Sequence, residues 1–210
     1  MMLLSLKRKQ QYGGSSHVAS IFIPQQTLQR IPVYEFKVGR VLATKDRNDV
    51  PTIIDEALLS AMEDPSTLVK TINFLGGAPL PNIGDAGADD NRTLSSLLGV
   101  YDVCIELKIK ALEEAILGHI SSCTYATWDI FIKFAKEVYG DTGKKKRTVD
   151  SSIGRVIKLK LTAFLPSLMQ DGTTQRVSAV GGVLSAQLLD ITIKHFSGDV
   201  KVERSVKIEQ

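Results

Sequence analysis

Cysteine and histidine are scarce in this chain, and their scarcity excludes several kinds of site. There are two cysteines, Cys104 and Cys123, with no Cys-x-x-Cys pair, and three histidines. A disulfide framework needs several cysteines, and a structural zinc site needs four Cys or His ligands at short spacings. We therefore expect neither, and two lone cysteines are typical of reduced core residues in an intracellular protein.

Long apolar runs and catalytic motifs are also lacking. No run approaches the roughly 20 apolar residues of a membrane-spanning helix, and the N-terminus has its apolar residues before its basic ones, the reverse of a secretory signal. The GxGxxG, HExxH and GxSxG motifs do not occur. The segment 140–147 fails as a phosphate-binding loop, because Val138 stands where the first Gly should be and Lys145 replaces the magnesium-binding Ser or Thr. We expect no enzyme active site, no cofactor and no metal.

The composition that is present is typical of a folded protein. Hydrophobic residues make up 43% of the 210 residues and charged residues 23%, which suits one domain with a large core. Residues 1–20 combine a basic cluster with adjacent glycines and show little periodicity. This predicts a flexible basic arm that is dispensable for folding. Residues 21–210 are expected to form a single α+β domain.

Alternating apolar and polar residues predict strands along much of that domain. The expected strands cover residues 33–42, 68–75, 103–110, 157–161, 189–193 and 200–208. Two stretches instead have helical spacing: 52–62, which begins with an acidic capping box, and 131–138, which ends at Gly140. A long Gly-, Pro- and Asp-rich loop is expected over 76–90. The pattern predicts an antiparallel sheet packed against two or more amphipathic helices.

Two basic clusters are the candidate binding residues. The first, called the basic loop below, comprises Lys144, Lys145, Lys146 and Arg147. It suits a nuclear-import peptide or an anion-binding contact, while the alternative is a solvated loop tip. The second comprises Lys7, Arg8 and Lys9, directly after the apolar residues of the N-terminus. It suits contact with an anionic membrane or a nucleoprotein, while the alternative is a disordered tail.

The order of elements resembles that of rhabdovirus matrix proteins. The similarity lies in a basic arm, a strand over 33–42, an amphipathic helix, and an apolar segment that ends in Asn73-Phe74-Leu75-Gly76-Gly77. It extends over about residues 1–77, and the arm has no Pro-Pro-x-Tyr motif. The resemblance implies a non-enzymatic protein that self-associates, condenses the viral nucleoprotein and bridges it to a lipid envelope. The basic loop would suit plant-infecting relatives whose particles assemble at the nucleus.

The sequence leads to two main functional hypotheses. The first is a viral matrix-type structural protein of the virion, which binds itself, the nucleoprotein and an anionic membrane surface during assembly and budding. It would occupy the host nucleus and cytoplasm and bind membranes peripherally, and a host nuclear-import receptor could recognise its basic loop. The alternative is a nuclear nucleic-acid-binding or movement-type viral protein that uses the same cations on RNA. An enzyme with a dispersed site is a third possibility.

Overall fold

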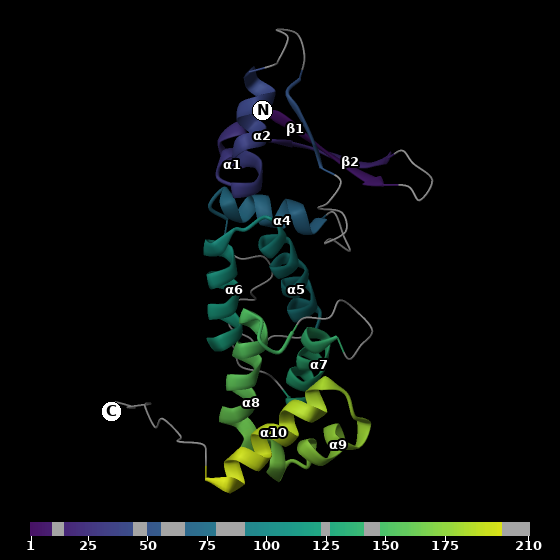
Figure 1. The fold of residues 1–210 in the computed structure, drawn as a ribbon, viewed down its shortest axis with the longest axis vertical. Helices are drawn as coiled ribbons and strands as arrows, with labels where there is room; N and C mark the ends of the chain where they lie inside the picture. Colours follow the sequence, from purple (N-terminus) through teal and green to yellow (C-terminus); the bar gives the residue numbers. More distant parts are fainter. Residues whose placement is uncertain are drawn as a thin grey trace, which may run out of the picture. The chain divides into compact units, whose positions relative to one another are not determined.

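The fold consists mainly of helices, as the computed structural model in Figure 1 shows. The structure describes residues 1–9, 15–43, 50–55, 66–78, 91–122, 127–140 and 148–198. The elements are β1 (Met2–Lys9), β2 (Ser15–Ile23), α1 (Gln25–Gln29), α2 (Pro32–Ala43), β3 (Thr52–Asp55), α4 (Ser66–Leu75), α5 (Asn91–Glu106), α6 (Lys110–Ser122), α7 (Trp128–Tyr139), α8 (Ser152–Gln170), α9 (Thr173–Val180) and α10 (Val183–Ser197). The chain divides into two compact units, Met1–Thr124 and Tyr125–Gln210, which are described separately.

The predicted α+β fold with an antiparallel sheet is wrong. The three described strands form one small mixed sheet in the order β2-β1-β3, in which β1 pairs antiparallel with β2 and parallel with β3. Five of the predicted strands, over residues 33–42, 68–75, 103–110, 157–161 and 189–193, are helical or lie at helix ends. The sixth, over 200–208, and most of the predicted loop 76–90 lie outside the described residues.

The sheet of the first unit begins at the N-terminus. Met2, Leu4 and Leu6 alternate along β1 and are fully buried, while Leu4 pairs with Ile53 of β3. Residues assigned to a flexible arm from the sequence therefore form β1 and most of β2, and the boundary expected at residue 21 falls inside β2. Burial of these three apolar side chains explains why the segment forms a strand, because burial offsets the conformational entropy that a free arm would keep. The single domain over 21–210 stays a prediction.

Helices complete the described part of the first unit. In α2, Tyr34 and Val38 are fully buried and lie four residues apart, so this segment has the helical spacing rather than the alternation predicted for 33–42. The side chain of Lys70 in α4 donates a 2.9 Å hydrogen bond to Ser96 in α5 and ties these two helices together. The prediction of a helix over 52–62 is wrong for its first four residues, because Thr52–Asp55 is strand β3.

The end of α5 shows why residues 103–110 were assigned to a strand. Val103 and Leu107 are buried, as predicted for one face of a strand, but Ile105 between them is exposed and Cys104 is buried. This is the burial pattern of a helix, in which residues three and four apart share a face. Lys108 then adopts a positive φ of 56° and ends the helix, a position that glycine occupies in many helices.

In the second unit, α7 confirms the predicted helix over 131–138. The predicted apolar face is buried, with Phe131, Phe134, Ala135 and Val138 all inside. The Thr127 hydroxyl accepts a hydrogen bond from the Ile130 amide at the helix start, and Gly140 ends the helix in the left-handed conformation with φ 76°. Both ends follow the expected capping preferences.

The other helices of this unit replace the strands predicted at 157–161 and 189–193. Ile157 and Leu161 of α8 are buried, but Leu159 between them is 70% exposed. In α10 the order is reversed, since Ile191 is buried whereas Leu189 and Ile193 are exposed. Apolar residues at every second position occur on both faces of these helices, which is how the alternation arises without a strand.

Candidate functional site

The β1–β2 hairpin positions the first basic cluster. Lys7, Arg8 and Lys9 form the last part of β1, and their backbone pairs with residues 15–17 of β2. A register shift lies between Leu6 and Lys7, at the point where the pairing of β1 with β3, which covers Leu3–Leu6, has ended. The cluster therefore belongs to the two-stranded extension of the sheet, on ordered backbone rather than on a flexible arm.

The sequence around this hairpin carries charge of one sign. The first 34 residues contain four basic residues, Lys7, Arg8, Lys9 and Arg30, and no Asp or Glu; the first acidic residue is Glu35. Such a segment attracts polyanions, although the sheet brings one acid from outside it, Asp55 of β3, opposite Leu6, the residue before Lys7. Counting charge along the chain would have revealed this segregation, whereas the net charge of +3 for the whole chain conceals it.

Two exposed apolar residues lie at the other end of the same hairpin. Phe22 on β2 pairs with Leu3 of β1, and its side chain is 60% exposed; Met1 precedes β1 and is also exposed. Leu3 and Lys7 are four residues apart on β1, which corresponds to roughly 13 Å along a strand. The hairpin thus combines cations with exposed apolar side chains over a short distance. We call Met1, Lys7, Arg8, Lys9 and Phe22 the hairpin surface.

The basic loop, with Lys144, Lys145, Lys146 and Arg147, lies outside the described residues, but the helices on either side of it are tied together. The hydroxyl of Tyr139, near the end of α7, donates a 3.3 Å hydrogen bond to the carbonyl of Gly154 in α8. Ser151 caps α8 by accepting from the Gly154 amide at 3.2 Å and donates to the Thr148 carbonyl at 2.6 Å. A Cβ atom at Gly154 would lie 2.5 Å from the Val149 carbonyl oxygen, so this close approach requires glycine.

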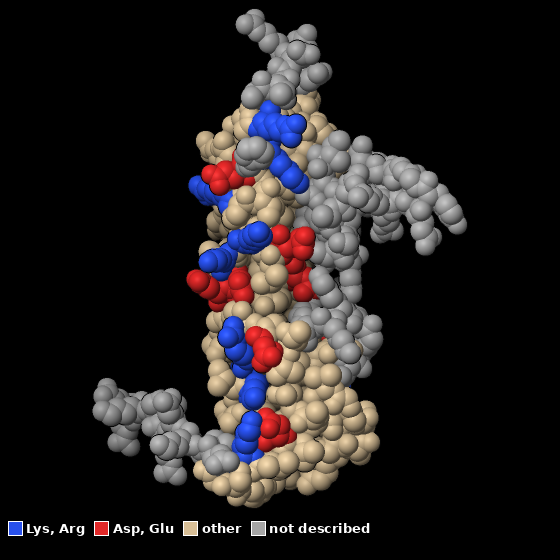
Figure 2. Space-filling view, viewed as in Figure 1, with Lys and Arg blue, Asp and Glu red and all other residues tan. Residues whose placement is uncertain are grey.

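Among the described residues, the segments predicted as strands at 103–110 and 157–161 do not form a sheet with a basic face. Four lysines alternate with apolar residues in the strands predicted at 103–110 and 157–161, but all four, Lys108, Lys110, Lys158 and Lys160, lie in helices or at helix ends. Lys160 is buried, with its ammonium 5.3 Å from the centroid of the Phe164 ring. On the face drawn in Figure 2, basic and acidic side chains of the described residues lie close together. The helices on this face therefore mix charges of both signs, whereas residues 1–34 of the sequence carry positive charge only.

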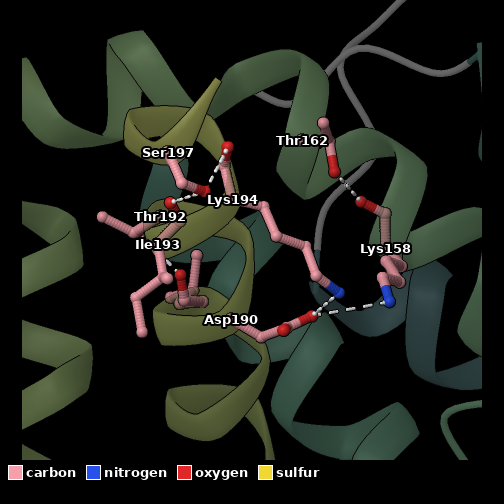
Figure 3. A network of polar contacts seen from close by, with 8 residues as sticks. Lys158, Thr162, Asp190, Thr192, Ile193, Lys194 and Ser197 are labelled. Atoms are coloured by element: carbon pink, nitrogen blue, oxygen red, sulfur yellow. Dashed lines mark hydrogen bonds and ion pairs between the residues drawn. The ribbon is translucent and has the colours of Figure 1, made fainter. Parts of the chain in front are cut away.

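A polar network joins α8 to α10, as Figure 3 shows. Asp190 lies between two lysines, 2.9 Å from Lys194 on its own helix and 3.7 Å from Lys158 on α8. The hydrogen bond from Lys194 is the main cause that lowers the pKa of the Asp190 carboxyl. These charges are exposed, so their ion pairs contribute little to stability. The network links α8 to α10 and contains two lysines and one aspartate.

An apolar stripe runs along α10 beside this network. It consists of Leu189, Ile193 and Phe196, which are 57%, 58% and 69% exposed. Their spacing of four and then three residues places them on one helix face. The opposite face, with Leu184, Leu188 and Ile191, is buried in the unit. We call Leu189, Ile193 and Phe196 the α10 stripe.

Cys104 is buried, and its thiol is free. Burial raises the pKa of its thiol to about 12, helped by the carboxylates of Glu113 and Asp102, and its sulfur donates to the Tyr101 carbonyl at 3.1 Å. A thiol with so high a pKa is a poor nucleophile at neutral pH, because the thiolate is the reactive form. This agrees with the prediction of a reduced core cysteine, while Cys123 lies outside the described residues.

Within the part of the chain that the structure describes, no group of three or more His, Cys, Asp or Glu could hold a metal ion. Over the same residues, no helix combines the length and the apolar character needed to cross a membrane.

Comparison of the chain with protein-family models, with curated proteins and with solved structures finds no match.

Proposed function

We propose that this protein is a non-enzymatic, matrix-type viral structural protein that associates with itself and connects nucleoprotein to an anionic membrane. The observation that carries the proposal is the hairpin surface, in which Lys7, Arg8 and Lys9 occupy ordered strand backbone within 34 residues that contain no acid. The element at 33–42, which the matrix resemblance took as a strand, is a helix, and so are residues 66–75 of its apolar segment. The proposal therefore rests on the hairpin rather than on that order of elements.

Ordered backbone strengthens the electrostatic argument. Three cations on a paired strand do not lose chain entropy when they meet a surface, whereas a free arm must be ordered on binding. Each basic residue near an anionic membrane contributes about 1 kcal/mol, so three contribute about 3 kcal/mol, or on the order of 100-fold in affinity. This is enough for reversible, peripheral binding and is removed by salt.

The apolar members of the hairpin surface favour a membrane as the anionic partner. Phe22 and Met1 are exposed at positions where a soluble hairpin gains nothing from an apolar side chain. Aromatic and apolar side chains beside cations are the combination by which peripheral proteins enter the boundary between headgroups and acyl chains. A nucleoprotein contact would use the cations alone, and the two partners can therefore be separated by mutation.

The test is co-sedimentation of the full chain with liposomes that contain acidic lipid and with neutral liposomes. We expect binding to the acidic liposomes at low salt, and on the order of 100-fold weaker binding after Lys7→Gln, Arg8→Gln and Lys9→Gln. The matched control removes three charges from the helical part of the same protein, by Lys108→Gln, Lys110→Gln and Lys133→Gln. It should bind nearly as well as the unaltered chain.

Equal loss in both triple variants would show that net charge, not the hairpin, governs binding. Equal binding to neutral liposomes, or no binding to either kind, would contradict the membrane part of the proposal. Tight RNA binding that weakens steeply with salt, together with no liposome binding, would instead favour the nuclear nucleic-acid-binding alternative.

A further inference from the structure

We infer that the α10 stripe is the surface through which a second copy of this chain binds, with the two α10 helices antiparallel about a two-fold axis near Thr192 and Ile193. The inference deepens the self-association in the proposed function and rests on it. Leu189, Ile193 and Phe196 are each more than half exposed on a helix whose other face is buried. An exposed apolar stripe of this kind marks a binding surface in a soluble protein.

The spacing of the stripe is nearly symmetrical about its own centre. The midpoint between Leu189 and Phe196 falls between Thr192 and Ile193. In an antiparallel pair centred there, Leu189 of one copy meets Phe196 of the other, and the two Ile193 side chains meet at the axis. A two-fold interface requires this self-complementarity, because the same surface must serve both sides.

The charged residues beside the stripe are centred at nearly the same point of α10 as the stripe itself. Asp190 and Lys194 lie on one flank of α10, where they form an ion pair within the helix. Thr192 is midway between them. The same antiparallel arrangement therefore brings Asp190 of each copy next to Lys194 of the other, so the acidic half of one flank meets the basic half of its partner. Complementary charges of this kind set the orientation and register of an interface more than its affinity.

This charge pattern distinguishes a second copy from a membrane. Helices that lie on anionic membranes carry mainly Lys and Arg on their polar face, whereas the flank of the α10 stripe includes an acid, Asp190, between Lys194 and Lys158. A second copy brings Lys194 of the partner to Asp190, whereas an anionic bilayer offers this carboxylate no cation. The hairpin surface, which lacks acids, fits the bilayer better.

The size of the stripe sets the expected strength. Three side chains that are 57%, 58% and 69% exposed offer on the order of 300 Å² of apolar surface. A standard interface buries roughly 800 Å² per partner. The stripe is therefore the apolar centre of a small interface, and we expect a weak dimer that forms at micromolar or higher concentration.

The first test is analytical ultracentrifugation of the full chain over a wide concentration range, with the variant Ile193→Lys. A lysine at the axis meets its own copy in the partner, so the dimer dissociation constant should rise at least about tenfold. Ile105→Lys is the matched control, because Ile105 is an exposed apolar residue on a helix of the other unit. It should dimerise like the unaltered chain.

The second test reports the orientation of the helices. In a Cys123→Ser background, an equimolar mixture of Leu189→Cys and Phe196→Cys chains should form a disulfide between the two variants under mild oxidation. Each variant alone should crosslink poorly, because the antiparallel register separates like positions. Preferred crosslinking of like with like would contradict the antiparallel arrangement.

Three further outcomes would overturn the inference. A strictly monomeric chain at all concentrations would exclude dimerisation, and a dimer that Ile193→Lys leaves intact would place the interface elsewhere. A monomer that dimerises only after residues 199–210 are deleted would show that the chain covers its own stripe. Failure of liposome binding by the hairpin would leave the dimer result standing, so the inference and the proposed function can fail separately.

Discussion

The two units of this protein present different kinds of surface. The first unit carries a cluster of basic residues on the β1–β2 hairpin. On the same hairpin the side chains of Met2, Leu4 and Leu6 are buried in the core of the unit. The second carries an apolar stripe on α10 beside charges that balance one another. Charge attracts polyanions and is screened by salt, whereas apolar contact is not weakened by salt. Under the proposed function, attachment would therefore belong to the first unit and self-association to the second.

The largest expected effect concerns the root of the hairpin. Leu4→Ala removes a fully buried side chain between β2 and β3 and should cost about 2–5 kcal/mol of unfolding free energy. Phe22→Ala on the same hairpin should cost much less, because that side chain is exposed. Chemical denaturation of both variants checks this. Equal stability of Leu4→Ala and the unaltered chain would mean that the hairpin is a loosely attached arm after all.

The next effect concerns the junction that fixes the ends of the basic loop in the second unit. Gly154→Ala places a Cβ atom 2.5 Å from the Val149 carbonyl and should destabilise the protein by roughly 1–3 kcal/mol. Gly118→Ala in α6 is the matched control, because nothing lies within 4 Å of its Cβ position. It should stabilise the protein by about 0.5–1 kcal/mol. The midpoint temperature of thermal unfolding should therefore fall for Gly154→Ala and rise for Gly118→Ala.

Alkaline pH should weaken both units through one buried group in each. Burial raises the pKa of Cys104 in the first unit and of Tyr139 in the second to about 12. The unfolded chain releases these protons at lower pH than the folded chain, so stability is full below about pH 9 and falls as pH rises toward 12. For Cys104 the slope approaches about 1.4 kcal/mol per pH unit midway between the two pKa values.

Denaturation at several pH values checks this expectation. Cys104→Ala and Tyr139→Phe should each reduce the dependence of stability on pH, whatever they do to the absolute stability. If both variants keep the full alkaline decline, other groups control it.

The smallest expected effect is a gain in stability at the end of α5. Lys108 has a φ of 56°, which disfavours a residue with a Cβ atom, so Lys108→Gly should stabilise the first unit by about 0.5–1 kcal/mol. Glu114→Gly, within the following helix, should have the opposite sign, because glycine weakens a helix interior. A loss of stability at both positions would contradict the left-handed turn.

Sequence patterns predicted α7, whose buried and exposed faces differ clearly. Its apolar residues Phe131, Phe134, Ala135 and Val138 recur every three or four positions, charged residues lie between them, and Gly140 marks the end. Elsewhere apolar residues also lie on the exposed face, as Leu159 does between buried Ile157 and Leu161. Such helices imitate the alternation of a strand, and period alone cannot separate them. The exposed residues of α10 that suggested a strand, Leu189 and Ile193, are two of the three that form the proposed dimer surface.

The hairpin was missed for a different reason. Its apolar residues Met2, Leu4 and Leu6 alternate over too short a stretch to outweigh the basic residues and glycines that follow. Pairing with β3, which lies some 50 residues later, supplies the burial that orders it. Long-range pairing of this kind is not visible in a local pattern. The cations of the hairpin were identified from the sequence, but their ordered backbone was not.

The most direct test of the central idea is clustering of acidic vesicles, because bridging needs both surfaces at once. Light scattering should show that the full chain clusters such vesicles. The variant with Lys7, Arg8 and Lys9 changed to Gln should neither bind nor cluster them. Ile193→Lys should still bind, as co-sedimentation reports, but should not cluster. Clustering by Ile193→Lys at the level of the unaltered chain would contradict the assignment of attachment to the hairpin and self-association to α10.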